Sequence, residues 1–304
     1  MMQEQGIEMF KDKRKSIMNW LMPKLLFLCA LVSIGTTVGI VWTLFGETVA
    51  FFKQVTVFDF ITGTQWTPLI DPRSYGVLPL LLGTFQVTLI ACLFAFPIGI
   101  ASAIYLSEYA PNRVRKVVKP ILEVLAGIPT IVLGYFALFF VTPQLQKIFD
   151  TMGIFNALSA GICVGIMIIP MISSLSEDAM NAVPKKLREG AFALGATRFE
   201  VATQIVFPAA LSGIIASFVL AFSRAIGETM IVTVSAGATP KIDINPLDSI
   251  QTMTAYIVQV ITGDAAHGTI EYQTVYAVGM TLFIITFLLN IVALLIARRY
   301  REEY

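Results

Sequence analysis

Apolar residues along the 304-residue chain gather in six long stretches that more polar segments separate. A helix that crosses the hydrocarbon core of a bilayer needs about 20 mostly apolar residues, and each stretch is long enough. Backbone polar groups at that depth must be bonded within the chain, which continuous apolar runs achieve as helices. The predicted spans are 24–46, 76–106, 117–141, 154–175, 209–236 and 274–297. The pattern therefore predicts an all-α, polytopic membrane protein with six transmembrane helices.

Charged residues are scarce and unevenly placed. They make up 13% of the chain, against roughly 25% in soluble domains. Sixteen Lys and Arg residues lie in or beside the N-terminal segment, the loops 107–120 and 176–208 and the C-terminal tail, whereas the opposite loops hold four. Positively charged loops stay in the cytoplasm. We therefore expect a multi-pass protein of the cytoplasmic (inner) membrane with both termini cytoplasmic, and an uncleaved first span because its apolar core is long.

The chain offers few residues for catalysis or metal binding. Cys29, Cys92 and Cys163 are dispersed in apolar runs, where a thiol behaves as a small hydrophobic group. His267 is the single histidine, so we expect neither a histidine-based metal site nor a Ser-His-Asp triad. A G-x-x-x-x-G-K-[ST] run is absent from the sequence, which leaves no P-loop for ATP. We expect no metal or cofactor bound by this chain, and no nucleic-acid partner.

Helix-breaking residues interrupt several of the predicted spans. Gly127 and Pro129 follow Glu123 within the third span. Membrane helices tolerate glycine and proline more often than soluble helices do, so such residues need no special role. Broken helices also line pathways whose walls must move. We therefore interpret Glu123, Gly127 and Pro129 as hinge or pathway candidates.

The loop 176–208 is the longest predicted cytoplasmic segment between two spans. After Pro184 the apolar pattern predicts a short helix, which Gly195 ends as a C-terminal glycine does. A second short helix is predicted from Arg198 toward Ile205, and the fifth span follows it. Together these segments predict a helix-turn-helix outside the bilayer, of a shape that a groove on a partner protein can receive.

Six residues of this loop stand at the spacing of a known motif. They resemble the EAA loop of ABC importer permeases, whose pattern is E-A-A, three residues, G, nine residues, I, then L-P. The sequence departs from it at the second position, a glycine in place of alanine, and at Phe207 in place of leucine. The resemblance implies that the loop couples the chain to a cytoplasmic ATPase subunit, which uses ATP and magnesium in trans. The matching residues are Glu189, Gly190, Ala191, Gly195, Ile205 and Pro208.

The fifth predicted span holds an arginine and a glutamate four residues apart. Arg224 lies about 15 residues into the predicted helix, roughly 22 Å along its axis, and an arginine at such depth costs about 2.5–3.5 kcal/mol. Glu228 would stand on the same helical face, so we expect the two to pair locally. Such a pair either only holds helices together or marks a passage. An arginine in a passage suits a tetrahedral oxyanion, and we select Arg224, Glu228 and Thr229 as substrate-pathway residues.

Further runs resemble the phosphate-specific permease family of ABC importers, PstC. These runs are Tyr105–Pro111, Leu125–Thr130, Ser176–Ala179, Ala193–Arg198 and Arg224–Met230. The sequence departs where Thr130 replaces a commoner serine and again over 231–237. The resemblance covers about 75–297 and implies an ABC type I importer permease fold. It divides the chain into a cytoplasmic N-terminal segment (1–23), a first transmembrane helix (24–46), a periplasmic segment (47–75), an ABC transmembrane type-1 permease domain (76–297) and a cytoplasmic tail (298–304).

The same resemblance implies a function and a set of partners. The chain would carry inorganic phosphate inward by alternating access, paired with a PstA-like second permease. Two PstB-like ATPase subunits and a periplasmic PstS-like phosphate-binding protein would complete the assembly. The outer loops 47–75 and 237–272 would meet the binding protein, although plain solvated loops need no such role. These loops hold Trp66, Asp71, Arg73, Lys241, Asp243 and Asp264.

Other functions stay open at this point. Sulfate or molybdate permeases also carry an arginine and a glutamate in this span, but there Phe-Gly usually follows the glutamate in place of Thr229 and Met230. The sister PstA subunit usually reads GETAP. An ion-coupled secondary transporter could use Glu228 as a proton site, although the loop spacing argues against it. A membrane enzyme would need a cluster of nucleophile, base and metal ligands that the sequence does not present.

Overall fold

The computed structural model describes the backbone of residues 2–263 and 265–299, and the side chains of 19–263 and 265–296. The predicted all-α class is confirmed, because helices make up the described structure apart from loops and one isolated bridge between Trp66 and Tyr75. Short π-helical turns, Tyr105–Tyr109, Ala137–Val141 and Val201–Val206, extend or join some helices. The α-helices are α1 (Met2–Phe52), α2 (Val57–Thr62), α3 (Leu78–Ile104), α4 (Asn112–Ala126), α5 (Thr130–Phe136), α6 (Thr142–Gln146), α7 (Ala157–Ala182), α8 (Lys185–Ala193), α9 (Arg198–Glu200), α10 (Phe207–Ala209), α11 (Leu211–Ile226), α12 (Met230–Ser235), α13 (Met253–Ile261) and α14 (Ile270–Arg299).

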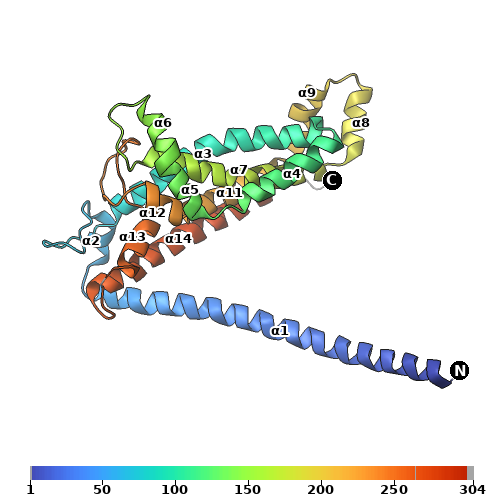
Figure 1. The fold of residues 1–304 in the computed structure, drawn as a ribbon, viewed down its shortest axis with the longest axis horizontal. Helices are drawn as coiled ribbons and strands as arrows, with labels where there is room; N and C mark the ends of the chain where they lie inside the picture. The colour runs from blue at the N-terminus through green and yellow to red at the C-terminus, as the bar shows by residue number, and fades with distance from the viewer. Residues whose placement is uncertain (1, 264, 300–304) are drawn as a thin grey trace.

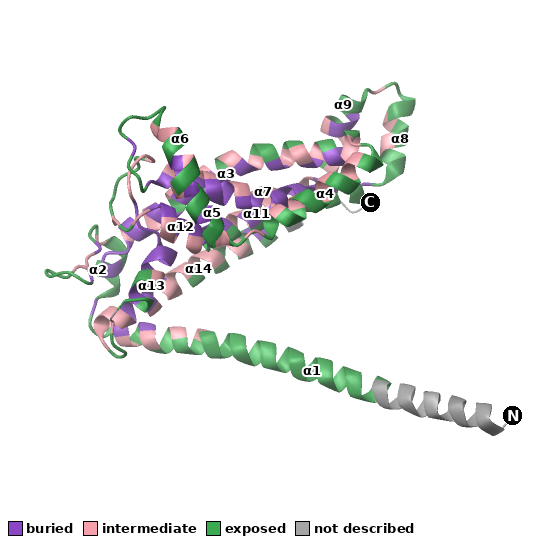
Figure 2. Cartoon of the chain, in the orientation of Figure 1, coloured by how far each residue is buried: buried purple, intermediate pink, exposed green. Residues whose placement is uncertain are grey.

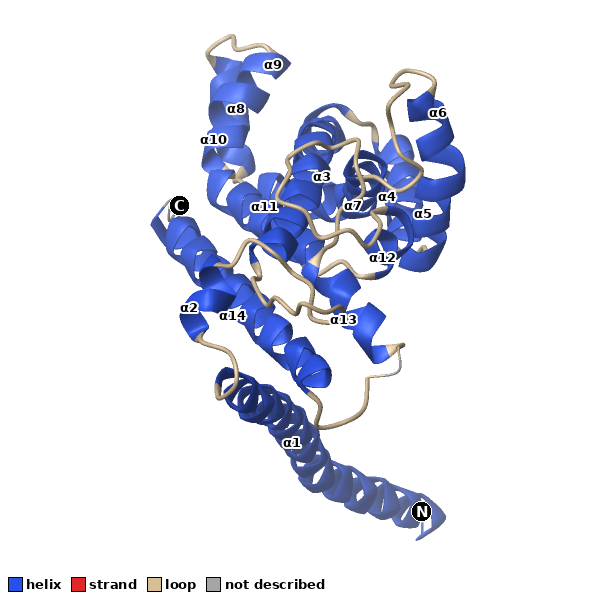
Figure 3. Cartoon of the chain, turned by 90° about the vertical axis from the view of Figure 1, so that its left-hand side faces the viewer, coloured by secondary structure: helices blue, strands red, loops and turns tan. Residues whose placement is uncertain are grey.

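The long helices run side by side between two distinct ends of the molecule (Figure 1). α7 packs on α3 and α11, and α11 packs on α14. Helices α8 and α9 lie at one end, whereas α2, α6 and α13 lie at the other (Figure 1). The N-terminal end of α1 and the C-terminal end of α14 lie at the end that carries α8 (Figure 1). We call the end that carries α2, α6 and α13 the far end. Seen from there, α14 lies between α1 and the bundle of α3, α7 and α11 (Figure 3).

Four of the six predicted spans are single helices. Four described helices, α1, α3 with its π-turn, α7 and α14, are long and apolar enough to cross a membrane, and two bent helix pairs bring the number to six. The bounds shift by several residues. The predicted second span starts two residues before α3, and α1 runs through both the expected N-terminal segment 1–23 and the first residues of the expected periplasmic segment 47–75.

The other two predicted spans are bent or interrupted rather than single continuous helices. The span 117–141 is bent by 88° where α4 gives way to α5. Pro129 precedes the first residue of α5, and a proline both lacks a backbone donor and clashes with the preceding helical turn, which explains the break. The span 209–236 stops after Ile226 and restarts at Met230, and a 71° bend at Ala210 separates α11 from the helical turns before it.

Helix also occurs in segments predicted as loops. The loop 176–208 begins inside α7, which continues to Ala182, so its irregular part starts at Val183. The outer loop 237–272 contains α13 and the first turn of α14. Tyr256 of α13 is fully buried and its hydroxyl lies 2.5 Å from that of Thr274 in α14. The far end of the molecule is therefore more ordered and more deeply packed than plain solvated loops.

Close contact between α3 and α7 forms the centre of the core. A Cβ placed on Gly161 or Gly165 of α7 would lie 2.6 Å from Ile90 and 2.9 Å from Phe94, both on α3. Small residues one turn apart allow membrane helices to approach closely, which replaces the hydrophobic driving force that is missing in lipid. The interface therefore fixes α3 and α7 as one unit.

Large apolar side chains remain exposed over much of the surface. The described side chains of α1 are almost all exposed as far as Phe45, and this helix extends away from the bundle (Figure 2). Soluble monomers rarely expose such continuous apolar surface. The exposure therefore agrees with a chain whose outer surface meets lipid.

Candidate functional site

The predicted helix-turn-helix between the fourth and fifth spans is confirmed. Helix α8 starts directly after Pro184, and Gly195 has φ +88°, the left-handed conformation that ends a helix without strain at glycine. Thr197 opens the next turn as a capping box: the backbone N–H of Glu200 donates to its hydroxyl at 3.3 Å. In return, the backbone N–H and hydroxyl of Thr197 donate to the carboxylate of Glu200, which lowers the pKa of that carboxyl.

This loop exposes apolar side chains at its tip. Leu194 is 91% exposed and Phe199 is 68% exposed, although large apolar side chains normally stay out of water. Among the predicted coupling residues, Glu189, Gly190, Gly195 and Pro208 are exposed, whereas Ala191 and Ile205 are half-buried. A Cβ on Gly190 would meet no atom of the chain within 4 Å. The departure from the family motif at this position therefore changes nothing inside the described structure.

One arginine joins α8 to the ends of two long helices. Arg188 donates from Nη1 to the carbonyl of Val183 and from Nη2 to the carbonyl of Met180, both at 2.6 Å. These carbonyls belong to the C-terminal end of α7, where backbone acceptors lack helical partners and favour a cation. The same guanidinium lies 3.0 Å from the carboxylate of Glu108, in the π-helical turn that follows α3. The loop is therefore anchored to α3 and α7 together.

The predicted local pair between Arg224 and Glu228 is wrong. Helix α11 ends at Ile226, Gly227 is its C-cap, and no ion pair joins the two residues in the described structure. The carboxylate of Glu228 accepts instead from the backbone N–H groups of Met230 and Ile231, at 3.1 Å and 3.3 Å. Glu228, which precedes the N-cap residue Thr229, therefore satisfies the first two backbone N–H groups of the restarted helix α12, a role that needs the break.

The break places the two charged residues in different surroundings. Glu228 is only 4% exposed, and its backbone carbonyl accepts from the hydroxyl of Thr254 in α13 at 2.7 Å. Arg224 lies on an exposed face of α11, with Nη2 4.0 Å from the sulfur of Met167. Thr229 is half-buried in the break itself, and its hydroxyl donates to the carbonyl of Gly227 at 3.2 Å. Thr254 is a neighbour that sequence reasoning missed, because nothing local marks a contact across 26 residues.

Helix α5 connects the hinge candidates to the break between α11 and α12. Gly127 and Pro129 flank the 88° bend between α4 and α5. A Cβ on Gly134 of α5 would lie 3.2 Å from the carbonyl of Met230 in α12. Glu123 is exposed and lines a cavity between α4 and α7 rather than contacting Arg224. The bend is thus observed, whereas its use as a hinge stays a prediction.

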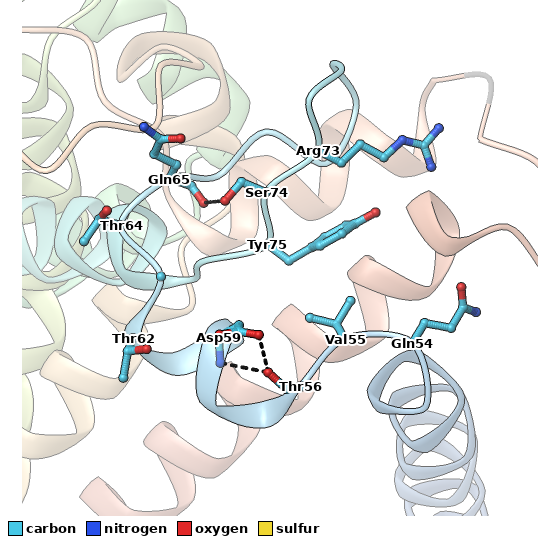
Figure 4. A pocket seen from close by; sticks show the side chains of 11 residues that line it. Gln54, Val55, Thr56, Asp59, Thr62, Thr64, Gln65, Arg73, Ser74 and Tyr75 are labelled. Carbon is cyan, nitrogen blue, oxygen red and sulfur yellow. Dashed lines mark hydrogen bonds between the residues drawn. The ribbon is translucent and has the colours of Figure 1, made fainter.

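A polar pocket of about 560 Å³ opens at the far end of the molecule, between α2 and the segment 63–75 (Figure 4). Arg73 lines it, and its Nη2 lies 2.7 Å from the carboxylate of Glu271 in α14. Trp66, one of the expected outer-surface residues, is buried against Phe60 and Tyr256, so it is unavailable for docking in this conformation.

The other residues expected to meet the binding protein have different surroundings. The side chain of Asp71 is exposed, and Lys241 lies 3.9 Å from Asp248. The carboxylate of Asp243 accepts from the backbone N–H of Asn245 at 3.2 Å. Asp264 lies outside the described residues. The far end therefore has a polar, partly charged surface, but fewer of the expected residues contribute to it.

Comparison with known proteins places these features in a family. The family described as "Binding-protein-dependent transport system inner membrane component" matches residues 95–302. The "Probable ABC transporter permease protein YqgH" of Bacillus subtilis (strain 168) is 37% identical over 263 residues, which cover 86% of this chain and 84% of that protein. The "Phosphate transport system permease protein PstC" of Mesorhizobium japonicum is 34% identical over 255 residues, covering 78% of this chain and 77% of that protein.

A solved structure matches over almost the whole chain. One chain of a bacterial alginate ABC transporter, crystallised with an alginate pentasaccharide-bound periplasmic protein, superposes with a TM-score of 0.66 at 17% identity. The match covers 91% of this chain and 95% of that one. At this identity the likeness concerns the fold alone.

Proposed function

Because this chain belongs to the family of binding-protein-dependent transport system inner membrane components, we propose that it carries inorganic phosphate inward as the permease subunit of an ABC importer. The family match and the structural likeness confirm the ABC importer permease fold. Phosphate as the substrate is supported by PstC proteins, among them those of Mesorhizobium japonicum and Haemophilus influenzae at 34% and 32% identity.

The observation that carries the proposal is the position of Arg224. It lies 13 residues after the first residue of α11, or about 20 Å along the axis, well within the depth of a bilayer. Its side chain is exposed in the isolated chain, and an arginine facing lipid at that depth costs about 2.5–3.5 kcal/mol or more. The exposed face of α11 therefore has to meet another subunit or a polar passage rather than lipid.

A phosphate ion fits this side chain chemically. The guanidinium carries a permanent charge and offers N–H groups in a planar fork that bind two oxygens of a tetrahedral anion. Glu228 does not neutralise it, because its carboxylate is held by the N-terminal backbone of α12. Arg224 is thus available as the anion-binding group of the passage, while Glu228 fixes the break that ends α11 next to it. Thr229, within the break, completes the pathway set.

The loop that carries α8 is proposed to receive force from ATPase subunits. Its exposed Leu194 and Phe199 form the apolar tip that a groove on a PstB-like ATPase would cover. Two such subunits would bind ATP and magnesium in trans, and a PstA-like permease would cover the exposed face of α11. Closure of the ATPases would act on Glu189, Gly195 and the neighbouring motif residues. A PstS-like binding protein would deliver phosphate at the far end, near the pocket of Figure 4.

The orientation in the membrane follows from charge. The chain is an inner-membrane component, and sixteen of its Lys and Arg residues lie in or beside the N-terminal segment, the loops 107–120 and 176–208 and the C-terminal tail, against four in the opposite loops. The positive-inside rule supports an orientation in which these segments and both termini would be cytoplasmic. Residues 47–75 and 237–272 would face the periplasm.

Reconstitution of the complete complex tests the proposal. Wild-type complex in proteoliposomes, with phosphate-loaded binding protein on one side and ATP on the other, is expected to take up labelled phosphate only when ATP is present. Labelled sulfate and molybdate serve as competing substrates. Uptake of sulfate in preference to phosphate, or uptake driven by a proton gradient without ATP, would overturn the assignment.

A further inference from the structure

Helix α4 is attached to the rest of the protein in an unusual way. None of its side chains is buried, although helices usually gain most of their stability from a buried apolar face. The stripe of Val117, Ile121 and Val124 is exposed. Its described contacts are mainly with α7, so the connection between these two helices determines where α4 lies.

That connection is a buried carboxylate on α7 with two cations from α4. Glu177 is fully buried, and Arg115 donates from Nε to its Oε1 at 2.6 Å. Lys119, one turn further along α4, lies 3.4 Å from Oε2 of the same carboxylate and 3.2 Å from Asp178. Asn181 also donates to Oε1, at 3.3 Å. Loss of the cationic partner of a buried carboxylate strongly destabilises a protein. Glu177 therefore holds the side chains of Arg115 and Lys119 in place.

The remaining interface between α4 and α7 is loosely packed. A mostly apolar cavity of about 330 Å³ lies between the two helices beside the ion pairs, and Lys119 and Glu177 line one side of it. Glu123 lines it from α4, and Pro170 and Met171 line it from α7. Close-packed interiors transmit displacement, whereas a void does not. Movement of α7 therefore reaches α4 through Glu177 rather than through side-chain packing.

The far end of α4 leads directly to the charged break. After the 88° bend, α5 packs on α12, where Gly134 faces the carbonyl of Met230. The carboxylate of Glu228 accepts from the first two backbone N–H groups of α12, and Arg224 lies four residues earlier. A displacement of α4 is thus converted at the bend into a displacement of the helix that borders the anion-binding arginine.

We propose that Arg115 and Lys119 are positioning residues that couple α7 to the α4–α5 arm through the buried carboxylate of Glu177. This inference rests on the proposed function, because the moving part is the loop that an ATPase would displace. That loop is fixed to α7 by Arg188. Force applied to α8 moves α7, Glu177 carries α4 with it, and α5 shifts α12 against the passage.

The test uses the full reconstituted complex and compares uptake with ATP hydrolysis. The double variant Arg115→Gln/Lys119→Gln is expected to keep the ATPase rate of the wild-type complex while its ratio of phosphate uptake to hydrolysis falls about tenfold or more. Arg113→Gln/Lys116→Gln is the matched control on the same helix, since neither residue forms an ion pair in the described structure. An unchanged ratio in the first variant, or an equal loss in the control, would overturn the proposal.

A double-variant cycle tests whether the residues act through one carboxylate. Arg115→Gln, Glu177→Gln and their combination are compared by the same ratio, with the amount of chain in the membrane measured in parallel. If the two side chains act through the same ion pair, the ratio of uptake to hydrolysis falls no further in the combined variant than in the worse single variant. Additive losses would show that Arg115 and Glu177 act independently and would contradict the coupling.

A distance measurement separates this proposal from the choice of substrate. Nitroxide labels at Val117→Cys on α4 and Leu175→Cys on α7 are placed in a Cys29→Ser background, since Cys92 and Cys163 are buried. In the otherwise wild-type complex the distance is expected to stay narrowly distributed with and without ATP. In the variant that lacks both cations it is expected to broaden. The broadening is expected even if phosphate is not the substrate. An unchanged narrow distance distribution in that variant would refute the coupling of α4 to α7 through Glu177.

Discussion

Nη2 of Arg188 in α8 lies 3.0 Å from Oε1 of Glu108 in the π-helical turn that follows α3, and this contact joins a surface loop to the membrane-embedded bundle. The same guanidinium caps the end of α7 through two backbone carbonyls. Because α3 and α7 pack closely on each other through small residues, Arg188 fixes the loop to both helices at once.

Replacing Arg188 is therefore expected to weaken this joint. Arg188→Gln removes hydrogen bonds from a charged donor and leaves Glu108 without its cation, at a cost of about 1.5–3 kcal/mol. We expect a lower unfolding temperature of the purified complex and a slower ATP-driven uptake. Lys186→Gln, on the same helix and exposed, is the matched control for thermal stability. An unfolding temperature equal to the wild type in Arg188→Gln would contradict the anchoring role.

Glu228 is expected to tolerate loss of its charge better than loss of its acceptor. Glu228→Gln keeps an oxygen that accepts from the N–H groups of Met230 and Ile231, whereas Glu228→Ala leaves both without that partner. Loss of a helix cap costs about 0.5–2 kcal/mol, so uptake should fall much further in the alanine variant. Equal loss in both variants would show that the negative charge itself is required, as for a proton site.

Gly134 is expected to accept no larger side chain. A Cβ at this position would lie 3.0–3.3 Å from three atoms of α12, two of them backbone, so Gly134→Val has to displace α12 or α5. Overpacking typically costs about 1–3 kcal/mol, and uptake is expected to fall while the chain still inserts. Gly46→Ala, where no atom lies within 4 Å, controls for the loss of glycine. Wild-type uptake by Gly134→Val would refute the close contact between α5 and α12.

The apolar tip of the α8 loop is expected to be needed for ATPase binding but not for folding. Leu194→Ser/Phe199→Ser changes two side chains that are 91% and 68% exposed, and exposed substitutions usually alter stability by less than about 0.5 kcal/mol. Co-purification of the ATPase subunit with the tagged permease should fall, while the amount of permease in the membrane stays unchanged. Full retention of the ATPase would exclude this tip as the docking surface.

Local signals in the sequence predict the α8 loop well. Pro184 and Gly195 act on the backbone next to them, so the start and end of α8 follow from their chemistry without knowledge of the fold. The single-helix spans are equally predictable, because a long apolar run at bilayer depth has few alternatives to a helix.

The charged site is less predictable because it depends on a break and on distant contacts. Pairing of Arg224 with Glu228 assumes a continuous helix, but the helix ends after Ile226. Glu228 is then held by α12, and Thr254 reaches its carbonyl from α13. The tie between Glu177 and Arg115 spans 62 positions, and no local pattern in the sequence predicts which lysine or arginine meets a buried carboxylate.

Phosphate uptake by Arg224→Gln tests the proposed role of this arginine most directly. The complex is reconstituted with its ATPases and loaded binding protein, and uptake of labelled phosphate is measured beside Arg113→Gln as the surface-arginine control. Loss of a charged donor to an oxyanion corresponds to about 1.5–3 kcal/mol, so uptake by Arg224→Gln is expected to fall about 10–100-fold while ATP hydrolysis and the control remain at the wild-type level. Wild-type uptake by Arg224→Gln would contradict a phosphate passage at this residue.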